Sequence, residues 1–172
     1  SWIAADNINT TGESLTAQSA NPLSNTIINN TPSVEIVTYT VTPTSSPDGC
    51  PGTPSNINVT VNPLPTMTSP TSATICTGDT VSIVLTSDSV STYTWIAADN
   101  SNTTGESTTS QSGSPLSDIL TNATASVETV IYTVTPTSSP QGCVGAPQTV
   151  NVGVNPGPTM TSPNSATICN SG

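Results

Sequence analysis

The chain carries few side chains that could do chemistry, and most of these are carboxylates or thiols. Its 172 residues include ten acidic residues and four cysteines, but no Lys, Arg or His. Histidine and lysine are the commonest general bases, and Ser–His or Cys–His nucleophile pairs need a histidine. We therefore predict that the protein is not an enzyme and that it has no catalytic residue, cofactor or metal.

The carboxylates recur in pairs along the chain. Hard carboxylate oxygens without competing cations are typical calcium ligands, but the sequence has no Asp-x-Asp-x-Asp-Gly loop. A glycosidase would need two carboxylates across a cleft, and nothing in the sequence predicts that placement. We favour solvated acidic groups that keep the protein soluble by repulsion. The recurring pairs are Asp6 and Asp99, Glu13 and Glu106, and Glu35 and Glu128.

The missing basic residues also limit the partners. Without Lys or Arg there is no cation to neutralise phosphates, so nucleic acid is excluded and anionic membrane surfaces are disfavoured. No apolar run approaches the roughly 20 residues of a membrane span, so no membrane insertion is predicted for this segment.

These side chains are positioned by a tandem repeat. The segment that begins at Trp2 recurs from Trp95, an offset of 93 residues, and the same offset relates Tyr39 to Tyr132. A period this long is typical of tandem domains, because solenoid repeats are shorter. Prolines at 63, 65, 156 and 158 mark short, semi-rigid joints. We predict an incomplete repeat lacking its first strands at 1–64, a complete repeat at 65–157, and the first strand of a third at 158–172.

Hydrophobic alternation predicts the fold of each repeat. Val, Ile and Leu alternate with Thr, Ser and Asn, and no helical period occurs. The prediction is an all-β, immunoglobulin-like antiparallel β-sandwich, repeated in an extended array. Its expected strands are 66–75, 80–86, 93–97, 116–120, 129–135 and 149–155. The expected core aromatics are Trp2, Trp95, Tyr39 and Tyr132.

Four cysteines, Cys50, Cys76, Cys143 and Cys169, allow two pairings that respect the repeat. Cys76 could pair with Cys143 within the complete repeat. Cys50 and Cys169 would then pair with cysteines outside this sequence, which we interpret as a segment of a longer polypeptide. Alternatively, Cys50–Cys76 and Cys143–Cys169 would join neighbours. We favour the first, because each domain is then closed on itself. Simple sandwich topology places these two turns at opposite ends, so either the ten-residue turn folds back or the topology differs from this simple arrangement. Paired cysteines indicate an oxidising, extracellular setting.

Several motifs together resemble a known family. They are Tyr-Thr-Val-Thr-Pro-Thr, Gly-Cys-x-Gly, Ala-Thr-Ile-Cys-x-Gly-Asp and Tyr-x-Trp-Ile. They are similar to the PKD-like and Ig-like tandem repeats of very large Bacteroidetes surface proteins, including gliding-motility adhesins of the SprB type and other cargo of the type IX secretion system. The resemblance implies an extracellular filamentous protein at the cell surface or released from it.

The resemblance also suggests sites of modification. Asp79-Thr80-Val81 and Asp88-Ser89-Val90 resemble the Asp-(Ser/Thr)-aliphatic O-glycosylation site of that phylum, with Thr80 and Ser89 as acceptors. Five asparagines match the N-glycan sequon, which we interpret as chance in a bacterial protein: Asn9, Asn29, Asn58, Asn102 and Asn122.

Two functional hypotheses follow. The first is a structural stalk segment of a long surface adhesin, used for attachment or gliding, whose partners are neighbouring repeats, a substratum, or other copies in a filament. The second is a repeat that binds surface polysaccharide. Sugar platforms need exposed aromatic rings, and this chain has two Trp, three Tyr and no Phe, so we favour the stalk.

Overall fold

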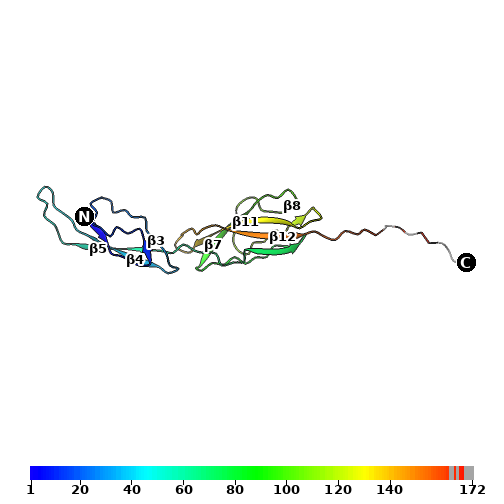
Figure 1. Ribbon diagram of the computed structural model, residues 1–172, viewed down its shortest axis with the longest axis horizontal. Coiled ribbons are helices and arrows are strands. Elements are labelled where there is room, and N and C mark those ends of the chain that lie inside the picture. Colours follow the sequence, from blue (N-terminus) through cyan, green and yellow to red (C-terminus); the bar gives the residue numbers. More distant parts are fainter. Residues whose placement is uncertain (163–164, 166, 169–172) are drawn as a thin grey trace.

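The computed structural model describes residues 1–162, 165 and 167–168, and these residues form strands, turns and extended segments without a helix. Two β-rich units lie in line along the long axis, with the N-terminus near one end and the C-terminal segment leaving at the other (Figure 1). The predicted all-β class and repeated sandwich are confirmed.

The second unit contains one five-stranded sheet and a smaller opposing layer. The sheet has the order β6-β12-β11-β7-β9, and β8 and β10 form a separate pair. All neighbours in the sheet are antiparallel except β6, which runs parallel to β12. The strands are β6 (Ser72–Cys76), β7 (Ser91–Ala97), β8 (Thr103–Thr104), β9 (Gln111–Ser112), β10 (Thr121–Asn122), β11 (Glu128–Ser138) and β12 (Gln148–Asn155).

Alternation of apolar and polar residues gives the sheet one buried face. Along β11, Val130, Tyr132 and Val134 are fully buried and alternate with exposed neighbours. Successive side chains of a strand point to opposite faces, so the Thr-rich positions face solvent. The same pattern in β12 buries three valines against the same core.

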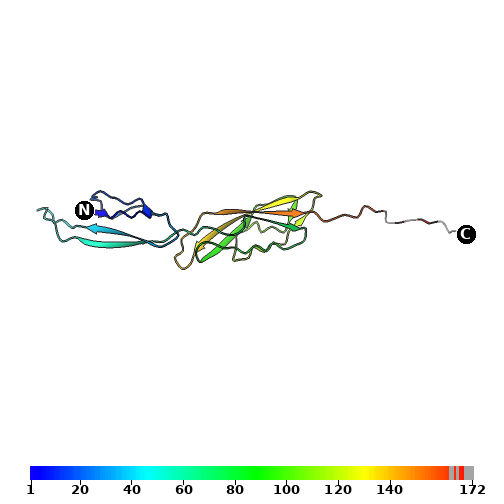
Figure 2. The same cartoon turned by 60° about the horizontal axis from the view of Figure 1, so that its bottom comes forward.

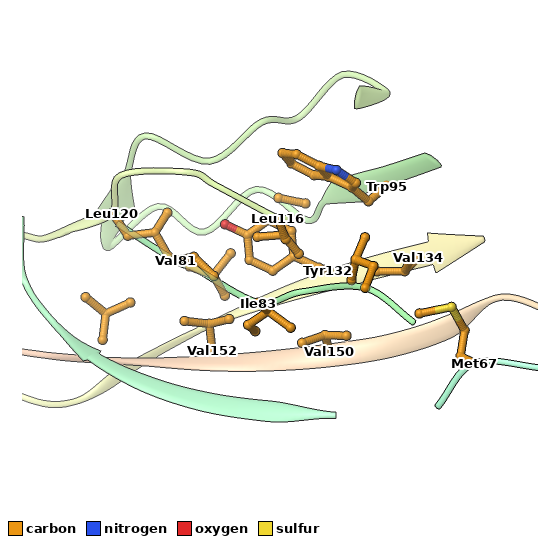
Figure 3. Close-up of a cluster of buried hydrophobic side chains, with 14 residues drawn as sticks. Met67, Val81, Ile83, Trp95, Leu116, Leu120, Tyr132, Val134, Val150 and Val152 are labelled. Atoms are coloured by element: carbon orange, nitrogen blue, oxygen red, sulfur yellow. The ribbon is translucent and has the colours of Figure 1, made fainter. Parts of the chain in front are cut away.

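The opposing layer differs from the sequence-based prediction. Continuous strands were expected at 80–86 and 116–120, but these segments pair through two isolated bridges, Thr80 to Ile119 and Ile83 to Leu116, and a hydrogen bond from the Val81 amide to the Asp118 carbonyl. A side chain replaces part of the ladder, because the amide of Leu85 donates to Oγ of Ser114 at 2.8 Å. The alternation still buries this layer against the sheet (Figure 3): Val81, Ile83, Leu85, Leu116 and Leu120.

The first unit repeats this arrangement on a smaller scale. Its main sheet has the order β1-β4-β5, beside the pair β2–β3. Its buried core of Trp2, Ala4, Val37 and Tyr39 corresponds to Trp95, Ala97, Val130 and Tyr132 in the second unit. Each Trp contacts its Tyr edge to face, with centroids 5.8 Å apart in the first unit and 5.9 Å in the second. The strands are β1 (Trp2–Ala4), β2 (Thr10–Thr11), β3 (Ile28–Asn29), β4 (Glu35–Val41) and β5 (Ser55–Val61).

The parallel strand β6 departs from the antiparallel sandwich expected from the sequence. The prediction placed one edge strand at 66–75, whereas 66–71 forms an isolated bridge from Met67 to Ser87, with backbone hydrogen bonds to residues 86–88, before β6 begins. Because β6 runs with β12, it carries its last residue to the end of the unit where β12 also finishes. This direction decides where the cysteines lie.

Candidate functional site at the joint between repeats

The linker between the two units is packed against the second one. Strand β5 ends at Val61, and the chain enters the second unit through the fully buried Pro65. The amide of Thr66 donates to the Asp88 carboxylate at 2.9 Å, and the Asp88 amide donates back to the Thr66 carbonyl at 3.0 Å. The start of the second unit is therefore fixed by paired hydrogen bonds.

Gly145 holds the linker against the cysteine turn. A Cβ added at Gly145 would lie 2.0 Å from the carbonyl oxygen of Pro65. Its counterpart Gly52 would meet the Pro43 side chain at 2.9 Å but no linker atom. A residue larger than glycine cannot occupy position 145 while the linker keeps this path.

Two hollows lie at the joint. One of about 220 Å³ is lined by Asn62 and Pro63 of the first unit and by Ser138, Ser139 and Gln141 of the second. A larger hollow has a volume of about 520 Å³. On one side it is lined by residues 27–32, 61–62 and 64, and on the other by Thr66 and Asp88 of the second unit. The two units approach each other closely here, end to end (Figure 2).

A buried polar group inside the second unit was missed by the sequence analysis. The Asp118 carboxylate accepts hydrogen bonds from the amide and hydroxyl of Ser107, each at 2.7 Å, and from the Tyr132 hydroxyl at 3.0 Å. Burial raises the pKa of Tyr132 above its ordinary value, and the Asp118 charge and hydrogen bond raise it further. The sequence does contain an indication that Asp118 is buried. It lies two residues from both Leu116 and Leu120, so the alternation that buries these leucines also places Asp118 on the inward face.

Several of the recurring carboxylates accept hydrogen bonds from side chains of nearby loops. The Glu35 carboxylate accepts hydrogen bonds from the side-chain Nδ2 groups of Asn7 at 3.1 Å and Asn9 at 3.0 Å. Glu128 accepts from Thr124 at 3.2 Å, and Glu106 accepts from Thr103. Within the described part of the chain, no three His, Cys, Asp or Glu residues gather as metal ligands. These acids stabilise loops in the structure.

Comparison with family models decides the assignment. The PKD-like domain model matches residues 1–65 and 73–158. This chain belongs to the PKD-like domain family. No curated protein that was compared matches the chain.

The cysteines of the complete PKD-like repeat lie at opposite ends of it. Cys76 pairs in register with Asn155 at the end of β12, whereas Cys143 lies beyond Ser138 at the far end of β11. The eleven residues of β11 span about 35 Å at about 3.3 Å each, far more than the 4.4–6.8 Å between Cα atoms of a disulfide. The predicted Cys76–Cys143 bridge is therefore wrong for this fold.

Among the described residues, Cys50, Cys76 and Cys143 are free thiols, and Cys169 lies outside them. The alternative pairing of Cys50 with Cys76 does not fit either. The Cys50 turn corresponds to the Cys143 turn and so lies at the N-terminal end of the first PKD-like repeat, while Cys76 lies at the C-terminal end of the second.

The predicted glycan acceptors differ in accessibility. Thr80 is exposed and stays a prediction. The hydroxyl oxygen of Ser89 is buried, so this residue does not suit modification in the folded PKD-like repeat. Among the asparagines that match the sequon, Asn122 is buried, and its side-chain Nδ2 group donates hydrogen bonds to the backbone carbonyls of Ser126 and Val154.

The aromatic residues are used for packing. Trp2, Tyr39, Trp95 and Tyr132 are at most 6% exposed. The remaining tyrosine, Tyr93, is partly buried, and its hydroxyl lies 2.9 Å from the Ser87 hydroxyl. Four of the five aromatic residues of the PKD-like repeats are thus buried, and the fifth packs partly buried against the core.

Proposed function

We propose that this chain is a stalk segment of a long extracellular filamentous adhesin, in which tandem PKD-like repeats set the reach and transmit force. The export route by type IX secretion and a role in attachment or gliding belong to this proposal. The observation that carries it is the joint, where Pro65 of the short linker is buried beside Gly145 and fixes the path of the chain into the second repeat.

The arrangement of strands supports a mechanical role. The long strands β4, β5, β11 and β12 all run along the axis of the array (Figure 2). A pull on both ends of a repeat would load the β6–β12 ladder in shear, because β6 is the first strand of the repeat, β12 is the last, and the two run parallel over five register pairs. Many hydrogen bonds would then have to break together.

The composition supports an extracellular, non-catalytic module. PKD-like domains are typical of extracellular proteins, and the residues described contain no helix long and apolar enough to cross a membrane. The net charge of −10 gives neighbouring filaments like charge, which favours solubility. Polysaccharide binding has less support, because the rings that would stack on sugars pack in the cores.

Electron microscopy of the full-length protein, on cells and after release, tests the proposal. A thin beaded filament with one bead per 93-residue repeat is expected. A compact particle would contradict the stalk. Retention of the purified array on immobilised surface polysaccharide would instead favour the binding module.

A further inference from the structure

Each end of a complete repeat carries one cysteine. Cys76 sits at the end where β12 runs into the next linker, and Thr77 donates its amide to the Asn155 carbonyl there at 2.9 Å. Cys143 sits at the other end, where its amide donates to Oγ of Ser138 at 3.0 Å and its carbonyl accepts from the Ser138 amide at 2.9 Å. Head-to-tail packing therefore brings the two kinds of cysteine to the same joint.

The joint in this structure shows where both would lie. Asn62 is the repeat counterpart of Asn155, the register partner of Cys76. Asn62 lines the 220 Å³ hollow together with Ser138 and Gln141 of the turn that holds Cys143. A cysteine in the place of Cys76 on the first repeat would lie beside Asn62 at this hollow, which residues of the Cys143 turn also line.

The larger hollow shows where the turn after this cysteine would lie on the first repeat. Its walls include Ile27, Asn29 and Asn62, whose counterparts Leu120, Asn122 and Asn155 contact the turn after Cys76. In the second repeat, the backbone amide of Gly78 donates to the Leu120 carbonyl at 2.7 Å. The backbone amide of Asn122 donates to Oγ1 of Thr77 at 2.9 Å. The hollow is thus lined by the counterparts of residues that hold the Cys-Thr-Gly turn in the second repeat.

We propose that the cysteine at the Cys76 position of each repeat forms a disulfide with the cysteine at the Cys143 position of the next repeat. Two thiols lose two protons and two electrons, and one S–S bond forms. The electrons pass to a disulfide oxidant such as glutathione disulfide, which is reduced to two thiols. Cys76 is exposed and Cys143 is partly exposed, so both can react. The inference goes beyond the stalk role and requires only consecutive complete repeats.

A duplicated chain tests the pairing. The whole sequence is kept, and residues 65–157 are present twice in succession, which creates one joint with both cysteines. The protein is oxidised with glutathione disulfide and cleaved at methionine with cyanogen bromide. Since Met67 and Met160 are the two methionines, Cys76 and Cys143 of one copy stay on one fragment and the two copies separate.

The expected result is that the two internal fragments stay linked without reductant and separate with it. Cys76→Ser in the first copy should abolish the link, whereas the same substitution in the second copy should leave it intact. This matched pair controls for effects of the substitution on folding. Free thiols throughout, a bridge inside one internal fragment, or a link to the fragment with Cys50 would each overturn the proposal. An unbridged array that is still filamentous would leave the stalk role standing.

Discussion

The hydroxyl of Tyr132 donates a 3.0 Å hydrogen bond to the carboxylate of Asp118 inside the second repeat. In the first repeat, Tyr39 makes the same contact with Asn25 at 2.9 Å. The same chain therefore contains both versions of one buried polar cluster. Each satisfies its tyrosine, but only one places a carboxylate beside it.

This natural pair predicts the effect of substitution at position 118. Asp118→Asn should change the free energy of unfolding by less than about 1 kcal/mol at neutral pH, because Asn25 makes equivalent bonds to Ser14 and Tyr39. Asp118→Ala should cost about 1–3 kcal/mol, because it leaves Tyr132 and Ser107 without their partner. Urea unfolding of both variants measures this, and equal losses would contradict it.

The raised pKa of Tyr132 predicts alkaline sensitivity. Its neutral form is favoured in the folded state by burial first and by Asp118 second. The stabilisation is complete below the ordinary tyrosine pKa of about 10 and is lost as the pH rises above it. Tyr132→Phe should flatten this decline, and Asp118→Asn should lessen it. Thermal melts between pH 8 and 12 measure how steeply the stability of each variant falls with pH. The same steepness in both variants as in the unmodified protein would refute the prediction.

Substitution of Gly145 should loosen the joint. The Cβ of Gly145→Ala would overlap the Pro65 carbonyl, so the linker or the turn must move at a cost of about 1–3 kcal/mol. Gly52→Ala is the matched control, since the three atoms nearest to its added Cβ all belong to Pro43. Small-angle X-ray scattering should show a broader distribution of long distances for Gly145→Ala alone. Identical curves for the two variants would argue against a rigid joint.

Substitutions of Gly105 and Gly113 should separate the stability cost of backbone strain from that of a steric collision. It has φ of +99°, and an added Cβ would lie 2.0 Å from the Ile119 carbonyl oxygen. Gly113 has φ of +104° with nothing within 4 Å. Gly113→Ala should cost about 1–2 kcal/mol from strain alone, and Gly105→Ala should cost more because it adds the collision. Chemical unfolding of the two variants gives the difference, which should vanish if collision is unimportant.

Much of the fold could be predicted from the sequence because period-two alternation determines which face of a strand is buried. Alternation along the expected strand 129–135 puts Val130, Tyr132 and Val134 on one face, and all three are buried. Strand continuity was less predictable. Segments 80–86 and 116–120 have the right alternation, yet side-chain hydrogen bonds such as that of Ser114 replace part of their ladder.

The candidate site was predicted less well than the fold. The Pro-rich joint was visible in the sequence, but the contact of Gly145 with the Pro65 carbonyl depends on a turn folding back over the linker. Asp118 was overlooked because its counterpart is Asn25, so the recurrence that drew attention to the other acids was absent.

The sequence by itself determined that this protein is an array of β repeats with a 93-residue period, aromatic cores and short stiff joints. Only the tertiary structure decided at which end of a repeat each cysteine lies. Alternation is the same in parallel and antiparallel strands, so it does not encode strand direction. The parallel pairing of β6 with β12 places Cys76 beside Asn155, away from Cys143, and so turns a bridge expected within a repeat into one proposed between repeats.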